Sequence, residues 1–145
     1  MGYAGAMTRQ EIVGKIGSVV DRFPAILVCL LFGSAAEDRH LEGSDVDVAV
    51  AGDRPLDEET TDDLRAQLEG QLSSEIDLLD LQRLDGLILR EILVNGETVR
   101  VHDEGLLARF ISRMLFHEAD MMPNYLMIVE SAARAFIDED CSRTR

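Results

Sequence analysis

Basic side chains are scarce in this chain of 145 residues. It has 14 lysine and arginine residues against 28 aspartate and glutamate residues, and Lys15 is its only lysine. The formal net charge is therefore −14. Because proteins bind nucleic acids largely by neutralising phosphates with lysine and arginine, this deficit argues against a DNA or RNA substrate. An acidic surface either attracts a basic protein partner through long-range electrostatics or serves solubility alone.

Cysteine and long apolar runs are scarce as well. The two cysteines, Cys29 and Cys141, are too few for a disulfide framework, which fits a reducing cytoplasm. No run of apolar residues is long enough for a transmembrane helix, and the first residues lack the basic and apolar regions of a signal peptide. We therefore expect a cytoplasmic protein, and its length predicts one domain with its own core.

The apolar pattern predicts alternating helices and strands. A capping-box pattern over residues 8–11 is followed by apolar residues at helical spacing. The segments predicted as helices are 8–23, 57–72, 84–94, 103–122 and 124–137. The segments predicted as strands are 25–32, 44–50, 75–81 and 98–102, with the last at or near a sheet edge. This order predicts an α/β or α+β fold, with a mixed sheet covered by helices mainly on one side.

The most specific pattern is a Gly-Ser pair followed, after ten residues, by two aspartates. Gly33 and Ser34 end the first predicted strand, where a glycine lets the backbone approach a phosphate closely. Asp45 and Asp47 lie in the second strand and point the same way, roughly 6.6 Å apart along the chain. Asp77 lies in the third strand, and carboxylates of this kind bind Mg²⁺ well. An isolated Asp-x-Asp pair would more often be the solvated face of a strand, but the Gly-Ser turn and the third carboxylate favour phosphoryl chemistry.

This arrangement resembles the DNA polymerase beta-type nucleotidyltransferase superfamily and, more narrowly, its minimal nucleotidyltransferase branch. The resemblance covers residues 8–102, the expected nucleotidyltransferase domain, with residues 103–140 as a C-terminal helical extension of it. Many members of that branch are antitoxins encoded beside a HEPN-domain RNase toxin, and some transfer AMP from ATP to a toxin tyrosine. The resemblance therefore implies a polymerase beta-like fold and an Mg²⁺-dependent protein adenylyltransferase that forms a hetero-oligomeric complex with a cognate HEPN toxin.

The resemblance also implies roles for individual residues. Asp45, Asp47 and Asp77 would be the catalytic carboxylates that hold two Mg²⁺ ions, and Asp77 would either complete the second metal site or accept the acceptor's proton. The implied nucleotide-binding residues are Gly33, Ser34, Ser44 and Arg39. Ser44 either donates a hydrogen bond to a phosphate or only shapes the turn before the acid pair.

Two acids depart from the family pattern. Relatives usually carry a basic or glycine-containing segment soon after the Gly-Ser pair, whereas this chain has Glu37 and Asp38 there. Their charges would repel a triphosphate unless they point outward, and we expect Arg39 to supply the missing positive charge. Asp80 lies on the opposite strand face from Asp77, and the resemblance implies that the third carboxylate is Asp77. We therefore expect Asp80 to be structural and to help cap the turn before the next helix.

Two other functions remain open from the sequence. A non-catalytic antitoxin would neutralise the toxin by binding alone, but it would not need three converging carboxylates. A small-molecule nucleotidyltransferase usually has a larger C-terminal region than the residues after position 102 provide.

Overall fold

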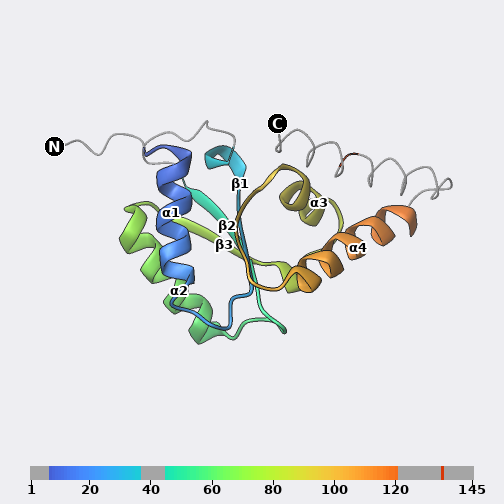
Figure 1. Ribbon diagram of the computed structural model, residues 1–145, viewed down its shortest axis with the longest axis horizontal. Coiled ribbons are helices and arrows are strands. Elements are labelled where there is room, and N and C mark those ends of the chain that lie inside the picture. Colours follow the sequence, from blue (N-terminus) through green and yellow to red (C-terminus); the bar gives the residue numbers. More distant parts are fainter. Residues whose placement is uncertain (1–6, 37–44, 121–134, 136–145) are drawn as a thin grey trace.

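The computed structural model describes residues 7–36, 45–120 and 135. These ranges contain four α-helices, four strands and two short 3₁₀ helices, η1 and η2 (Figure 1). In chain order the elements are α1 (Arg9–Val20), β1 (Val28–Phe32), η1 (Gly33–Ala35), β2 (Val46–Ala51), α2 (Glu58–Leu72), β3 (Ile76–Asp80), η2 (Leu81–Arg83), α3 (Gly86–Asn95), β4 (Glu97–Val101) and α4 (Glu104–Asp120). Apart from residue 135, the helix predicted at 124–137 lies outside the described residues.

The four strands form one mixed sheet in the order β3-β2-β1-β4. β1 pairs antiparallel with both of its neighbours, whereas β2 and β3 run parallel and are joined through α2. β4 lies at one edge, as predicted, and β3 lies at the other edge of the described sheet.

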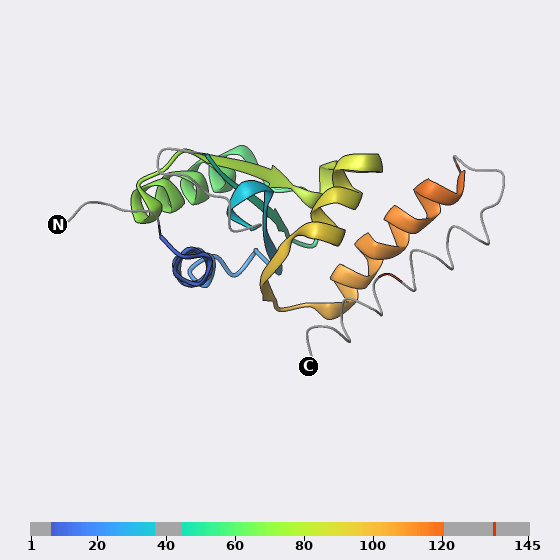
Figure 2. The ribbon, with the colours of Figure 1, turned by 90° about the horizontal axis from the view of Figure 1, so that it is seen from above.

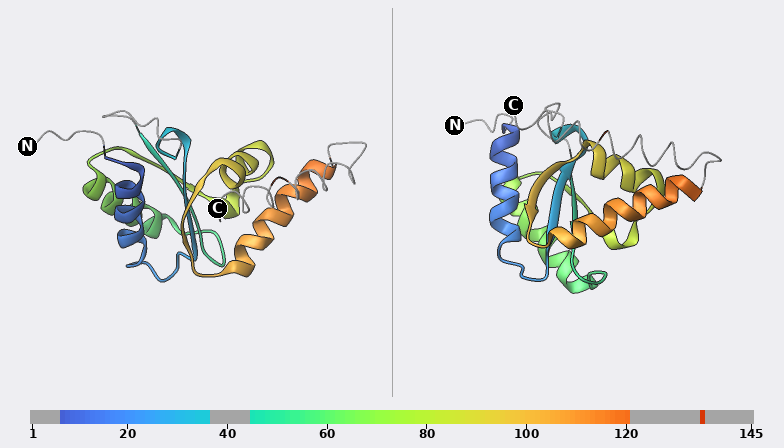
Figure 3. Two further views of the ribbon diagram at one scale, coloured as in Figure 1. Left: turned by 45° about the horizontal axis from the view of Figure 1, so that its top comes forward. Right: turned by 45° about the vertical axis from the view of Figure 1, so that its right-hand side comes forward.

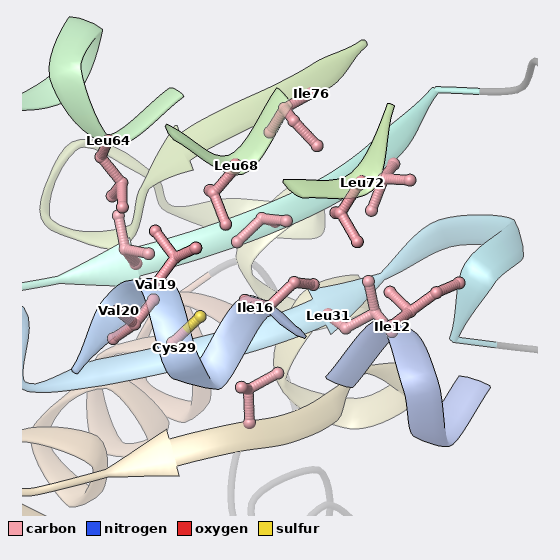
Figure 4. Close-up of a cluster of buried hydrophobic side chains, with 14 of the residues drawn as sticks. Ile12, Ile16, Val19, Val20, Cys29, Leu31, Leu64, Leu68, Leu72 and Ile76 are labelled. Carbon is pink, nitrogen blue, oxygen red and sulfur yellow. The ribbon is translucent and has the colours of Figure 1, made fainter. Parts of the chain in front are cut away.

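Helices α1 and α2 cover one face of the sheet. The predicted capping box begins α1: the Thr8 hydroxyl accepts from the Glu11 N–H at 3.1 Å, and the Thr8 N–H donates to the Glu11 carboxylate at 2.9 Å. These two bonds give partners to the backbone N–H groups of Thr8 and Glu11, and they therefore stabilise the first turn of α1. The buried side chains of this layer interlock with those of the strands (Figure 4); they include Ile12, Ile16, Val19, Leu31, Leu64, Leu68, Leu72 and Ile76.

Helices α3 and α4 cover the opposite face, which corrects the expectation of helices mainly on one side. Leu89 and Ile92 of α3 and Phe110 of α4 pack against Leu30 and Ala49 of the central strands. Figure 2 shows α1 and α2 on one side of the sheet with α3 and α4 on the other, and both views of Figure 3 show the same layers. The physical reason lies in β1, whose five residues are all buried, so both of its faces need a cover.

Arg113 joins α4 to the end of β3. Its Nη2 donates to the Leu81 carbonyl oxygen at 2.7 Å, and its guanidinium carbon lies 4.9 Å from the centre of the Phe110 ring. This arginine is therefore part of the packing between the helical layer and η2. None of the helices in the described ranges has the length and apolar character that crossing a membrane requires.

Candidate active site

Gly33 and Asp47 are in direct contact where β1 ends. Phe32 of β1 pairs with Asp47 of β2, and the next residue, Gly33, has φ +74°, in the left-handed region that glycine adopts without strain. A Cβ atom added at Gly33 would overlap the Oδ2 atom of Asp47. Only a glycine therefore lets the chain turn this closely over the carboxylate.

The turn that Gly33 opens, residues 33–36, is referred to below as the Gly-Ser turn. Its first three residues form η1, and the Ala36 N–H closes it by donating to the Gly33 carbonyl oxygen at 3.1 Å. N–H groups at the start of such a turn have no partner within it. These amides can therefore bind an anionic oxygen beside Asp47.

Asp47 and Asp77 lie side by side on neighbouring strands. The parallel register of β2 and β3 pairs them directly. Both point to the sheet face that α3 and α4 cover, because Val46, Val48 and Ile76 belong to the opposite core. Asp47 is half-buried and Asp77 is exposed.

Asp45 completes the group of three acids. It lies one residue before β2, is exposed, and has the same side-chain parity as Asp47. Burial raises the pKa of Asp47 to about 6, with further contributions from the Asp77 charge, a hydrogen bond with the Asp77 carboxyl group and the Asp45 charge. The three sequence-predicted carboxylates therefore come together, and their mutual repulsion favours a bound cation.

This arrangement fits a magnesium ion that arrives with a nucleotide. Within residues 7–36 and 45–120, no three His, Cys, Asp or Glu side chains form a ready-made cage for a metal. Mg²⁺ rarely needs such a cage, because one or two carboxylates together with substrate phosphates and water complete its six oxygen ligands. Asp47 and Asp77 could provide the carboxylates, and the amides of the Gly-Ser turn could bind the phosphates.

Residues 14–105 match the family model for polymerase beta nucleotidyltransferases, which is more than half of the chain. The chain belongs to this nucleotidyltransferase family. The resemblance found in the sequence is thereby confirmed, and the nucleotidyltransferase can be compared with individual relatives.

One curated relative is the protein adenylyltransferase MntA of Shewanella oneidensis, which is 29% identical over 77 residues. That match covers 53% of the nucleotidyltransferase and 55% of the relative, so the chain spans little more than half of the length of MntA.

Solved structures show the same fold. A toxin–antitoxin crystal structure with AMP-PNP matches with a TM-score of 0.64 at 21% identity, over 89% of this chain and 98% of the other. A complex of the tri-AMPylated HEPN toxin of Shewanella oneidensis with its MNT antitoxin matches with a TM-score of 0.63 at 20% identity, over 87% and 99% of the two chains. At these identities the likeness establishes the polymerase beta-like fold of the nucleotidyltransferase.

Asp80 is structural in the nucleotidyltransferase, as predicted. Its Oδ2 accepts from the Leu56 N–H at 2.8 Å, and its Oδ1 accepts from the Gln82 N–H at 2.9 Å. The Arg83 Nε lies 3.6 Å from the same carboxylate. Asp80 thus caps η2 and ties the loop before α2 to the end of β3.

Four of the residues discussed for the active site lie outside the described part of the chain. They are Ser44 and Arg39, predicted to bind the nucleotide, and the two acids Glu37 and Asp38. Their roles stay predictions.

The structure adds Arg9, to which the sequence assigned no role. Its Nη1 donates to the carbonyl oxygen of Ala36, at the end of the Gly-Ser turn, over 3.1 Å. No spacing rule links two residues 27 positions apart in different elements. The only sequence signal is that Arg9 is the first residue after a strong helix cap.

Proposed function

We propose that this chain is an Mg²⁺-dependent adenylyltransferase that transfers AMP from ATP to a tyrosine of a cognate HEPN-domain toxin. In this role it acts as the antitoxin, in the cytoplasm. The observation that carries the proposal is the convergence of Asp45, Asp47 and Asp77 beside the Gly-Ser turn in a member of a nucleotidyltransferase family. The name of the relative MntA and the AMPylated toxin in a structural neighbour support the choice of acceptor.

The nucleotide would lie between the Gly-Ser turn and the acid pair. Backbone N–H groups of Gly33 and Ser34 would donate to oxygens of the β- and γ-phosphates. Asp45, Asp47 and Asp77 would hold two Mg²⁺ ions, which offset the charge of the triphosphate and stabilise the entering and leaving oxygens. Ser44 and Arg39 remain proposed further contacts to the nucleotide.

We assign the activation of the acceptor to Asp77. It is exposed on β3, at the edge of the described sheet, whereas Asp47 is half-buried between β1 and β3. The Asp77 carboxylate would accept the proton of the tyrosine hydroxyl as its oxygen attacks the α-phosphorus. A P–O bond to the tyrosine forms, the bond to the β-phosphate oxygen breaks, and pyrophosphate leaves.

The test is intact mass spectrometry of the protein encoded beside this gene, after incubation with this chain, ATP and Mg²⁺. We expect a mass gain in whole AMP units. The gain should be absent with Asp45→Asn or Asp47→Asn and present with Asp53→Asn, which changes an exposed acid in the turn after β2.

The other outcomes separate the competing functions. A stable complex without any mass gain would contradict the enzyme and support an antitoxin that neutralises by binding alone. Neither a complex nor a mass gain would exclude this acceptor and direct the search to small molecules that carry a hydroxyl group.

A further inference from the structure

The Arg9 side chain brings a positive charge to the end of the Gly-Ser turn. Its partly buried hydrogen bond to the Ala36 carbonyl oxygen joins α1 to a segment 27 residues away. Ala36 is only 6% exposed, and its own N–H bonds back to Gly33. Arg9 therefore holds the last residue of the turn whose first residue contacts Asp47.

The position of Arg9 is itself fixed. Arg9 follows Thr8, the N-cap residue of α1. Thr8 and Glu11 form both hydrogen bonds of a capping box. One and two turns further on, Ile12 and Ile16 are fully buried against the sheet. The helix cap and these buried side chains hold the backbone of Arg9 against the sheet. The hydrogen bond from its guanidinium group therefore ties the Gly-Ser turn to α1.

The charge of Arg9 matters in this setting. Asp47 lies against the first residue of the turn, the charges of Asp77 and Asp45 act on Asp47, and the chain as a whole carries −14. A cation at the end of the turn would offset part of the repulsion between these acids and an anionic ligand bound at the turn.

We propose that Arg9 is a positioning residue for the nucleotide. By holding the Ala36 carbonyl it keeps the amides of the Gly-Ser turn aimed at the triphosphate, and its charge favours the anion. This inference rests on the proposed function, since it needs the turn to bind ATP. Arg9 contributes to nucleotide affinity, and hence to the KM for ATP, much more than to the kcat of AMP transfer.

The test is calorimetric titration of the full chain with AMP-PNP and Mg²⁺. Arg9→Met keeps the aliphatic stem but removes the donor and the charge, and we expect its Kd to rise about tenfold, as for the loss of a charged hydrogen bond. Arg9→Lys keeps a donor and the charge and should recover most of the affinity. The matched control is Arg22→Met, because Arg22, which follows the C-cap of α1, also joins two distant segments: its Nη1 donates to the Gln67 side chain of α2 at 3.1 Å.

Each outcome has one meaning. A wild-type Kd for Arg9→Met would overturn the inference and leave the proposed function intact. An equal loss of affinity in Arg22→Met would also overturn it, since the effect would then be one of general stability. If the wild-type chain bound no AMP-PNP, the proposed function and this inference would fail together.

In AMP transfer, a raised KM for ATP with an unchanged kcat in Arg9→Met would support the positioning role, whereas an unchanged KM would contradict it.

Discussion

Asp47 and Asp77 occupy paired positions on the parallel strands β2 and β3, and this proximity helps to raise the pKa of Asp47 to about 6. Burial of the Asp47 carboxylate is the larger cause of this raised pKa. The raised pKa has separate consequences for stability and for activity.

The first prediction concerns stability without metal. Between the ordinary pKa of an aspartate, 3.8, and about 6, the folded state binds more protons at Asp47 than the unfolded state does. Stability from this group therefore falls as the pH rises through that window. We expect Asp47→Asn to stabilise the metal-free protein by about 1 kcal/mol near neutral pH, after allowance for solvent screening of a half-exposed group.

Thermal melting in a metal chelator would measure this effect. The gain should shrink as the pH is lowered from about 7 to about 5, because Asp47 then takes up a proton in the folded wild type. A gain that does not depend on pH would contradict the electrostatic explanation.

The second prediction concerns the rate of AMP transfer against pH. Protonated Asp47 cannot act as an anionic ligand, so kcat/KM for ATP with Mg²⁺, which reports the free enzyme, should fall about tenfold for each pH unit well below 6. A rate that stays constant from about pH 7.5 down to about pH 5 would contradict a role for ionised Asp47.

The third prediction concerns the Gly-Ser turn. Gly33→Ala places a Cβ atom on the Asp47 carboxylate and forces a φ of +74° on a residue that disfavours it. We expect a loss of at least about 2 kcal/mol in unfolding free energy and the loss of nucleotide binding. Gly14→Ala is the matched control, because nothing lies within 4 Å of an added Cβ in that helical position. It should be neutral or stabilise by up to about 1 kcal/mol, and chemical denaturation of the three proteins would settle both values.

The fourth prediction separates Asp80 from the catalytic acids. Asp80→Ala removes the acceptor for the Leu56 and Gln82 N–H groups, so we expect a loss of about 2 to 3 kcal/mol in unfolding free energy. Nucleotide affinity, measured well below the melting temperature, should stay at the wild-type value. Lost affinity with unchanged stability would instead place Asp80 in the active site.

The order of elements could be predicted from the sequence because it depends on local patterns. The capping box at Thr8 and the apolar stripe of Leu64, Leu68 and Leu72 follow from neighbours within one or two helical turns, and the structure confirms both. The structural role of Asp80 was predicted from strand alternation together with the family resemblance, and the structure confirms it.

Other features depend on how distant segments dock. The pairing of Asp47 with Asp77 needs α2 to carry the chain back parallel to β2, and spacing alone does not fix that register. The second helical layer was missed because the periodicity of α3 shows an apolar face without saying which side of the sheet it covers. The bond from Arg9 to Ala36 arises only after α1 has packed on the sheet.

The exposed place of Asp77 on an edge strand leaves the described acid cluster open toward an approaching surface. A folded acceptor protein could present a hydroxyl group to Asp77 without inserting an extended segment into a pocket. Its surface would then cover the acid cluster. Within the described residues, the same exposure leaves Asp45 and Asp77 accessible to water. Discrimination between a tyrosine and water would therefore depend on docking of the acceptor.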